Sequence, residues 1–245
     1  MRIITDAKLG AVLAGIPGPP RVVASGNFAT PWRVLGLLDA AIGEYRLYVL
    51  NAQPGVPDRP GVTLETSFVG AGMRGRSQLD YFPGRLSLVP RLLTETLPPD
   101  VVLLHTSTPI HGTVSLGIEV NVLPAAIEAV RARGGLVIAQ LNRRMPYTFG
   151  DGVLPQSEID YAIEVDEPLP SPPPWVVTDV SRSIGERVAA QITDGATLQL
   201  GIGAVPDAVL SELTSRRGLS IWSEMFSDGV LRLEKAGALA GHPAS

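Results

Sequence analysis

The sequence predicts an α/β protein with a largely parallel sheet and flanking helices, followed by a second, incomplete α/β domain. Three observations support this prediction. Short β-branched runs alternate with helical patterns, strand runs such as Val101–Leu104 are apolar throughout, and a proline-rich stretch divides the chain. Strands that are apolar on both faces are typical of parallel sheets covered by helices on two sides.

The predicted elements follow in chain order. Strands are expected at Arg21–Ala24, Arg46–Leu50, Val62–Phe68, Val101–His105, Leu136–Leu141 and Thr197–Leu200. Helices are expected at Pro31–Ile42, Leu86–Thr96, Val122–Arg133, Val180–Ile192 and Val205–Thr214. Two arginines in the last turn of the third helix, followed by Gly134, form a typical helix end.

Five prolines lie between Val165 and Trp175. Proline interrupts helices and sheet interiors, and a proline-rich segment forms a stiff, extended connector. We therefore predict a first domain over residues 1–168, a linker over 169–176 and a second domain over 177–245.

A weak internal repeat spans this boundary. A strand, a glycine turn and a helix that begins near a proline occur once in each half of the chain, at one constant offset. The matching pairs are Gly26 and Gly201, Ala29 and Ala204, and Pro31 and Pro206. The repeat predicts two similar domains, of which the second is too short to match the first.

Composition excludes several classes of function. With 245 residues, of which 45% are hydrophobic, the chain can bury a core. A net charge of −4 without a dense Lys/Arg cluster argues against nucleic acid or an anionic membrane as partner. The absence of cysteine excludes disulfides, thiolate catalysis and cysteine metal sites. No signal peptide and no apolar stretch of about 20 residues is visible, so we expect a cytoplasmic protein.

The run Ser223–Gly229 contains the most informative carboxylate, Glu224. Its aromatic and apolar neighbours predict partial burial, and a carboxylate in such a place could attack an activated acyl group. A helix-start residue on the surface is the alternative. Asp228 is a rival carboxylate, although Asp228 followed by glycine also fits ordinary turn chemistry.

Two glycine turns could serve a ligand. The turn Gly201–Val205 precedes a helix, so its free N–H groups could cradle a phosphate-bearing cofactor or an oxyanion; a tight turn without ligand is the alternative. Pro206 stands where a dinucleotide fingerprint needs glycine, which disfavours NAD. In the first half, Asn27 after Gly26 could cap the next helix or donate a hydrogen bond to an oxyanion.

Other site types have little support. His105 and His111 lie near no cysteine and no acidic residue at a zinc-ligand spacing, and no Gly-x-Ser-x-Gly motif occurs. We expect no metal and no permanently bound cofactor.

Several motifs in order resemble the acetyl-CoA hydrolase/transferase family, especially its 4-hydroxybutyrate CoA-transferase-like members. The motifs are Phe68–Gly75, Leu88–Leu92, His111–Gly117, Ser157–Asp160, Val165–Pro170, Asp194–Gly203 and Ser223–Gly229. The resemblance covers nearly the whole chain. It implies a NagB/RpiA/CoA-transferase-like fold of two similar α/β domains with the active site between them.

The resemblance also implies roles for individual residues. Glu224 corresponds to the acyl-accepting nucleophile, and Gly26 and Asn27 fall in an oxyanion-stabilising loop. The turn that contacts coenzyme A, a substrate here, comprises Gly201, Ile202, Gly203, Ala204 and Val205.

The activity implied is transfer of coenzyme A between an acyl-CoA and a small carboxylic acid through a glutamyl-CoA thioester, without ATP or metal. If water intercepts the intermediate, the same site is a hydrolase. The family continues past position 245, and Phe149 stands where relatives often carry histidine. We therefore expect a homo-oligomer or a second chain that supplies the missing C-terminal half, with a non-catalytic subunit as the alternative.

Overall fold

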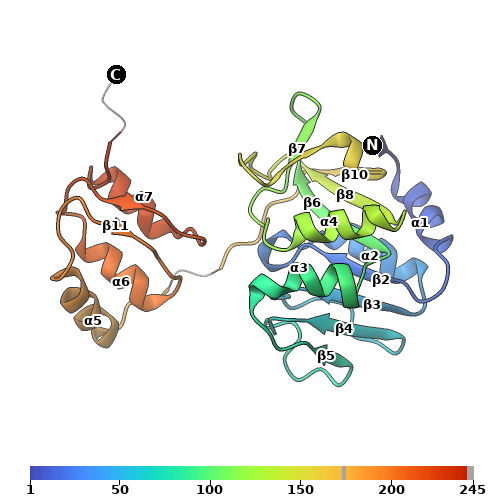
Figure 1. Cartoon of the computed structure of the whole chain (residues 1–245), viewed down its shortest axis with the longest axis horizontal. Helices are drawn as coiled ribbons and strands as arrows, with labels where there is room; N and C mark the ends of the chain where they lie inside the picture. The colour runs from blue at the N-terminus through green and yellow to red at the C-terminus, as the bar shows by residue number, and fades with distance from the viewer. Residues whose placement is uncertain (173–174, 242–245) are drawn as a thin grey trace. The chain divides into compact units, whose positions relative to one another are not determined.

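Eight parallel strands form the central sheet of the structure, a computed structural model that describes residues 1–172 and 175–241 (Figure 1). The chain divides into two compact units, Met1–Ser171 and Pro172–Ser245. The division falls inside the range 169–176, for which the sequence predicts a linker. Within the described ranges no helix is both long and apolar enough to cross a membrane.

The strand order in the first unit is β1-β10-β8-β6-β2-β3-β4-β5. The strands are β1 (Arg2–Ile3), β2 (Arg21–Ala24), β3 (Tyr45–Val49), β4 (Val62–Thr66), β5 (Leu79–Tyr81), β6 (Val101–Ser107), β8 (Leu136–Asn142) and β10 (Tyr161–Val165). From β2 the chain proceeds outward through β3, β4 and β5, and then returns to β6 on the other side of β2. The sheet therefore has a switch point between β2 and β6, where open parallel sheets bind ligands at the carboxyl ends of the strands.

Alternating side chains of the central strands enter two separate cores. In β2, Val22 and Ala24 pack in one core and Val23 packs in the other. The first core is covered by α1 (Asp6–Ala14) and α2 (Trp32–Ala41), and the second by α4 (Leu123–Ala132). Burial on both faces explains why these strands read as continuous apolar runs.

One predicted helix differs in its geometry. The range Leu86–Thr96 is not one α-helix but a 3₁₀ turn η2 (Leu86–Leu88), a short α-helix α3 (Val89–Arg91) and a π-helical turn η3 (Leu92–Thr96). Pro90 lies in the first turn of α3 and has no N–H to donate, so a regular helix cannot continue through it from Leu86. The remaining elements of the unit are η1 (Asn27–Ala29), η4 (Gln156–Glu158) and the antiparallel pair β7 (Thr113–Ser115) and β9 (Val153–Pro155).

A fully buried glutamate, Glu65 in β4, is held by two arginines. Arg21 Nε lies 2.8 Å from Glu65 Oε2, and Arg46 Nη1 lies 2.8 Å from Oε1. Removing one partner of a buried ion pair is costly because the remaining charge loses its compensation.

We expect Arg21→Met to lower the free energy of unfolding by about 2–3 kcal/mol, measured by urea denaturation. The matched control is Arg91→Met. Arg91 forms an exposed pair with Glu95 one helical turn away, and its loss should cost less than about 0.5 kcal/mol. Equal effects of the two substitutions would contradict the role assigned to Glu65.

The second unit contains a parallel pair, β11 (Thr197–Leu198) and β12 (Ser220–Ile221), with α5 (Asp179–Ala189), α6 (Ala204–Glu212) and α7 (Asp228–Lys235). α5 and α6 pack closely: a Cβ on Gly185 would lie 2.9 Å from the carbonyl carbon of Ala208. The predicted strand Thr197–Leu200 ends two residues early. Asp228, for which turn chemistry was the alternative to a role as rival carboxylate, is the first residue of α7.

Candidate active site

The turn after β2 lies at the switch point of the first unit's sheet. Gly26 is required there, because a Cβ at this position would lie 2.0 Å from the carbonyl oxygen of Leu50. Asn27 follows with a positive φ of 45° and begins η1. The turn after β2 therefore packs directly on the loop after β3.

The side chain of Asn27 is bound within the protein. Its Nδ2 lies 2.9 Å from both carboxyl oxygens of Glu119, and its Oδ1 accepts a hydrogen bond from Asn51. The expectation that Asn27 caps the next helix was wrong, because the N-cap residue of α2 is Pro31. Within the described residues, neither the backbone N–H of Asn27 nor that of Phe28 has an acceptor.

Glu119 is a buried carboxylate of this site that the sequence reasoning missed. Its side chain is buried, with 6% of its surface exposed. Burial raises the pKa of its carboxyl group, and the hydrogen bonds from Asn27 and Asn121 act in the opposite direction. The signal was present in the sequence: one acidic residue stands in the apolar run Leu116–Leu123. A carboxyl group in such a run usually has a functional or ion-pairing reason.

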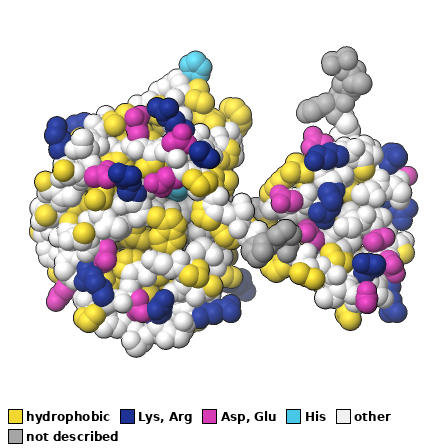
Figure 2. All heavy atoms as spheres, turned by 180° about the vertical axis from the view of Figure 1, so that it is seen from behind, with side chains coloured by type: hydrophobic (Ala, Val, Ile, Leu, Met, Phe, Trp, Pro, Cys, Tyr) yellow, Lys and Arg dark blue, Asp and Glu magenta, His cyan; other side chains and the backbone are white. Residues whose placement is uncertain are grey.

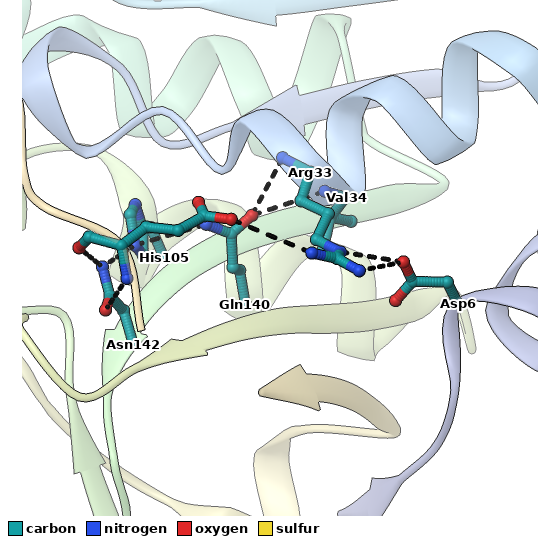
Figure 3. A network of polar contacts seen from close by, with 7 residues as sticks. Asp6, Arg33, Val34, His105, Gln140 and Asn142 are labelled. Atoms are coloured by element: carbon teal, nitrogen blue, oxygen red, sulfur yellow. Dashed lines mark hydrogen bonds and ion pairs between the residues drawn. The ribbon is translucent and has the colours of Figure 1, made fainter. Parts of the chain in front are cut away.

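A second polar network lies at the start of α2 (Figure 3). Gln140 Oε1 accepts the backbone N–H of Arg33 at 3.1 Å. Asn142 Nδ2 lies 3.1 Å from His105 Nε2 and donates to the carbonyl oxygen of Glu167 at 2.8 Å. The network thus joins β6, β8 and the segment that follows β10.

His105 is buried inside this network rather than placed for metal binding. Burial lowers its pKa from 6.5 to about 4, and the neighbouring backbone groups of Thr30 and Ala29 act in the opposite direction. The imidazole is therefore neutral at pH 7. Among the residues that the structure describes, no group of three or more His, Cys, Asp or Glu side chains is placed to hold a metal ion.

The burial of His105 predicts acid sensitivity. Between pH 6.5 and about 4 the unfolded chain binds a proton that the folded chain does not. The free energy of unfolding therefore falls as the pH falls through this window, by up to about 3 kcal/mol. In His105→Gln this contribution should vanish. The measurement is urea unfolding followed by NMR signals of the first unit. If the difference in free energy of unfolding between the wild type and His105→Gln stayed constant from pH 7 to pH 4, this prediction would be wrong.

In the second unit Glu224 follows β12 and lies beside the glycine turn. Ser223 Oγ donates to the carbonyl oxygen of Leu200 at 2.9 Å and lies 3.2 Å from the Leu200 N–H. These bonds join the segment before Glu224 to the segment before Gly201. The prediction of partial burial was wrong: Glu224 is exposed, and so are its neighbours Trp222 (78%) and Phe226 (64%).

The turn itself ends in the N-terminus of α6. Gly203 has a φ of 124°, a conformation that favours glycine, and among the described residues no side chain caps this helix start. Uncapped N–H groups and the positive end of the helix attract anions.

A shallow depression lies at the segment that carries Glu224. It is lined by Ile221, Ser223, Glu224, Met225 and Phe226 among others. The lining thus combines one carboxylate with apolar and hydroxyl side chains, a mixture that is common in ligand pockets.

The structure thus brings Glu224 and the turn Gly201–Val205 together within the second unit. Gly26 and Asn27 lie in the first unit with Glu119. On the face drawn in Figure 2, positive and negative side chains are interspersed over both units, with apolar side chains between them.

The family model for the acetyl-CoA hydrolase/transferase N-terminal domain matches residues 21–172. The chain belongs to the acetyl-CoA hydrolase/transferase family. This confirms the resemblance drawn from the motifs.

Curated members of the family are similar to this chain. The 4-hydroxybutyrate coenzyme A transferase of Clostridium kluyveri is 44% identical over 177 residues, which are 70% of this chain and 40% of that protein. The succinyl-CoA:acetate/propanoyl-CoA:succinate CoA transferase of Fasciola hepatica is 34% identical over 232 residues, 89% of this chain and 48% of that protein. The chain spans less than half the length of these two relatives.

Solved structures of the family share the fold. RipA from Yersinia pestis superposes with a TM-score of 0.85 at 25% identity, over 97% of this chain and 59% of that one. The 4-hydroxybutyrate CoA-transferase from Porphyromonas gingivalis gives 0.75 at 29% identity, over 97% of this chain and 58% of that one. The predicted fold class, a largely parallel α/β sheet with flanking helices, is confirmed.

Proposed function

We propose that this chain carries the nucleophile of a CoA-transferase, which moves coenzyme A between an acyl-CoA and a small carboxylic acid through a glutamyl-CoA thioester. The family and the CoA-transferase relatives support the reaction class. The observation that carries the assignment is the position of Glu224, an exposed carboxylate that follows β12 and whose neighbour Ser223 is hydrogen-bonded to Leu200, the residue before the glycine turn.

The proposed reaction converts one thioester into another, so the overall change in free energy is small. The Glu224 carboxylate attacks the acyl-CoA carbonyl, and the C–S bond breaks to give a mixed anhydride and CoA thiolate. The thiolate attacks the Glu224 carbonyl and releases the first carboxylate, leaving a glutamyl-CoA thioester. The acceptor carboxylate attacks this thioester, the C–S bond breaks with release of CoA thiolate, and a second anhydride forms. The thiolate then takes the new acyl group and restores Glu224.

The two glycine turns have separate roles in this proposal. Gly201, Ile202, Gly203, Ala204 and Val205 contact coenzyme A, supported by the uncapped start of α6. The turn of Gly26 and Asn27 stabilises the oxyanion of the tetrahedral intermediates. Each well-placed N–H donor contributes roughly 3–4 kcal/mol to such stabilisation.

The experiment is an exchange assay with acetyl-CoA and ¹³C-butyrate. Because the chain spans only part of its relatives, it is assayed alone and after addition of the C-terminal half of the Clostridium kluyveri relative. Formation of ¹³C-butyryl-CoA in either arm supports transfer. Release of free coenzyme A without butyryl-CoA identifies the hydrolase alternative. Neither product from folded protein in either arm would refute the proposed activity.

A further inference from the structure

Three asparagines and one buried glutamate form a hydrogen-bonded cluster at the switch point of the first unit's sheet. This asparagine cluster comprises Asn27, Asn51, Asn121 and Glu119. Each asparagine comes from a different loop: after β2, after β3 and before α4. All three have positive φ angles, of 45°, 51° and 23°. Positive φ angles are uncommon in residues other than glycine, although asparagine adopts them more readily than most, and strained backbone concentrates at functional sites.

The hydrogen bonds between side chains of the cluster are all donated in the direction of Glu119. Glu119 accepts from Asn27 and from Asn121, and Asn27 in turn accepts from Asn51. The Asn121 Oδ1 accepts the N–H of Val122 at the start of α4. Since an ionised carboxylate only accepts and an amide both donates and accepts, Glu119 fixes which way the Asn27 amide points.

This arrangement determines which donors remain at the turn. The side-chain NH₂ of Asn27 is taken by Glu119. The turn is closed by the bond from the Ala29 N–H to the Gly26 carbonyl at 3.0 Å, and Thr30 Oγ1 donates to the Asn27 carbonyl at 3.2 Å. The backbone N–H groups of Asn27 and Phe28, on half-buried residues, are left without acceptors within the described ranges.

We propose that Glu119 is a positioning residue, which clamps Asn27 so that the backbone N–H groups of Asn27 and Phe28 stay free to bind an anionic oxygen of the substrate. The inference rests on the proposed function for the identity of that oxygen, a carboxylate or an acyl oxyanion. Glu119 itself acts only through Asn27.

The test variant is Glu119→Gln. Its amide keeps one oxygen that can accept from Asn27, but an NH₂ group replaces the other oxygen, which also lies 2.9 Å from Asn27 Nδ2. The clamp therefore loses its charge and one of its two acceptor contacts, with almost no change in volume. We expect kcat of the exchange reaction to fall about 10- to 100-fold, because a misplaced oxyanion donor loses most of its effect, while KM for acetyl-CoA stays within about 2-fold.

A second readout does not depend on turnover. Acetate is titrated into the whole chain, and the backbone amide signals of Asn27 and Phe28 are followed by ¹H–¹⁵N NMR. We expect saturable shifts in the wild type and binding weakened about 10-fold in Glu119→Gln. If the wild type binds acetate at these amides but shows no exchange, the proposed function fails and the role of Glu119 stands.

Two further variants separate positioning from stability. Glu65→Gln neutralises a fully buried glutamate of the same unit that lies outside the cluster. It should leave kcat within about 3-fold of the wild-type value at a temperature where both variants are folded.

The double variant Asn27→Asp with Glu119→Gln restores matched donors and acceptors, because the new carboxylate at position 27 would accept from Asn51 and from the new amide at position 119. It should recover at least part of kcat. An unchanged kcat and acetate affinity in Glu119→Gln, or an equal kcat loss in Glu65→Gln, would overturn the proposal.

Discussion

Replacing Glu224 by glutamine should abolish CoA exchange, with kcat/KM lowered about 10⁴-fold or more. An amide is too weak a nucleophile to attack a thioester and cannot form the mixed anhydride. Because Glu224 is exposed, the substitution removes no buried contact, and the free energy of unfolding should stay within about 0.5 kcal/mol of the wild type. The measurements are the exchange assay and urea denaturation.

The matched control is Asp228→Asn. Asp228 lies four residues later, is also exposed and occupies the first turn of α7. Its replacement should change exchange by less than about 3-fold and weaken the helix start by roughly 0.5 kcal/mol. If Asp228→Asn abolished exchange and Glu224→Gln did not, the nucleophile would be assigned to the wrong carboxylate.

Replacing Gly26 by alanine should lower exchange at least about 100-fold. The new Cβ would lie 2.0 Å from the Leu50 carbonyl oxygen, so the turn must move away from the loop after β3. The displacement carries the N–H groups of Asn27 and Phe28 with it. We also expect a loss of about 1–3 kcal/mol in the free energy of unfolding.

The control for this variant is Gly36→Ala in α2. Gly36 is exposed within the helix, and a Cβ there meets nothing within 4 Å. Alanine should raise the free energy of unfolding by about 0.5–1 kcal/mol and leave exchange unchanged. Full activity in Gly26→Ala would show that the turn has no part in the reaction.

The main body of the fold could be predicted from the sequence because its central strands are apolar on both faces. β2 was predicted with its observed bounds, and β6 and β8 were each predicted within two residues of their observed ends. The edge elements were missed. β1 has two residues and β5 has three, too few for a periodic pattern, and they form strands only because they pair with β10 and β4.

The candidate site was predicted in part. Two glycine turns and a carboxylate that follows the second of them are visible in the sequence, because glycine spacing and residue type carry that information locally. The exposure of a side chain is not determined by its sequence neighbours alone. The aromatic neighbours of Glu224 suggested burial, whereas Trp222 and Phe226 are themselves mostly exposed. The contact of Glu119 was missed because its hydrogen-bond partner, Asn27, lies 92 residues earlier in the chain. Only the parallel sheet brings the two residues together.

The most direct test of the proposed reaction follows oxygen rather than coenzyme A. When ¹⁸O-labelled acetate accepts coenzyme A, the bridging oxygen of the second anhydride comes from acetate and stays on Glu224 when the thiolate takes the acetyl group. The predicted result is ¹⁸O on Glu224, located by fragmentation mass spectrometry of the tryptic peptide 218–232 after turnover with butyryl-CoA. Exchange that proceeds while Glu224 remains unlabelled, or label on Asp228 instead, would contradict it.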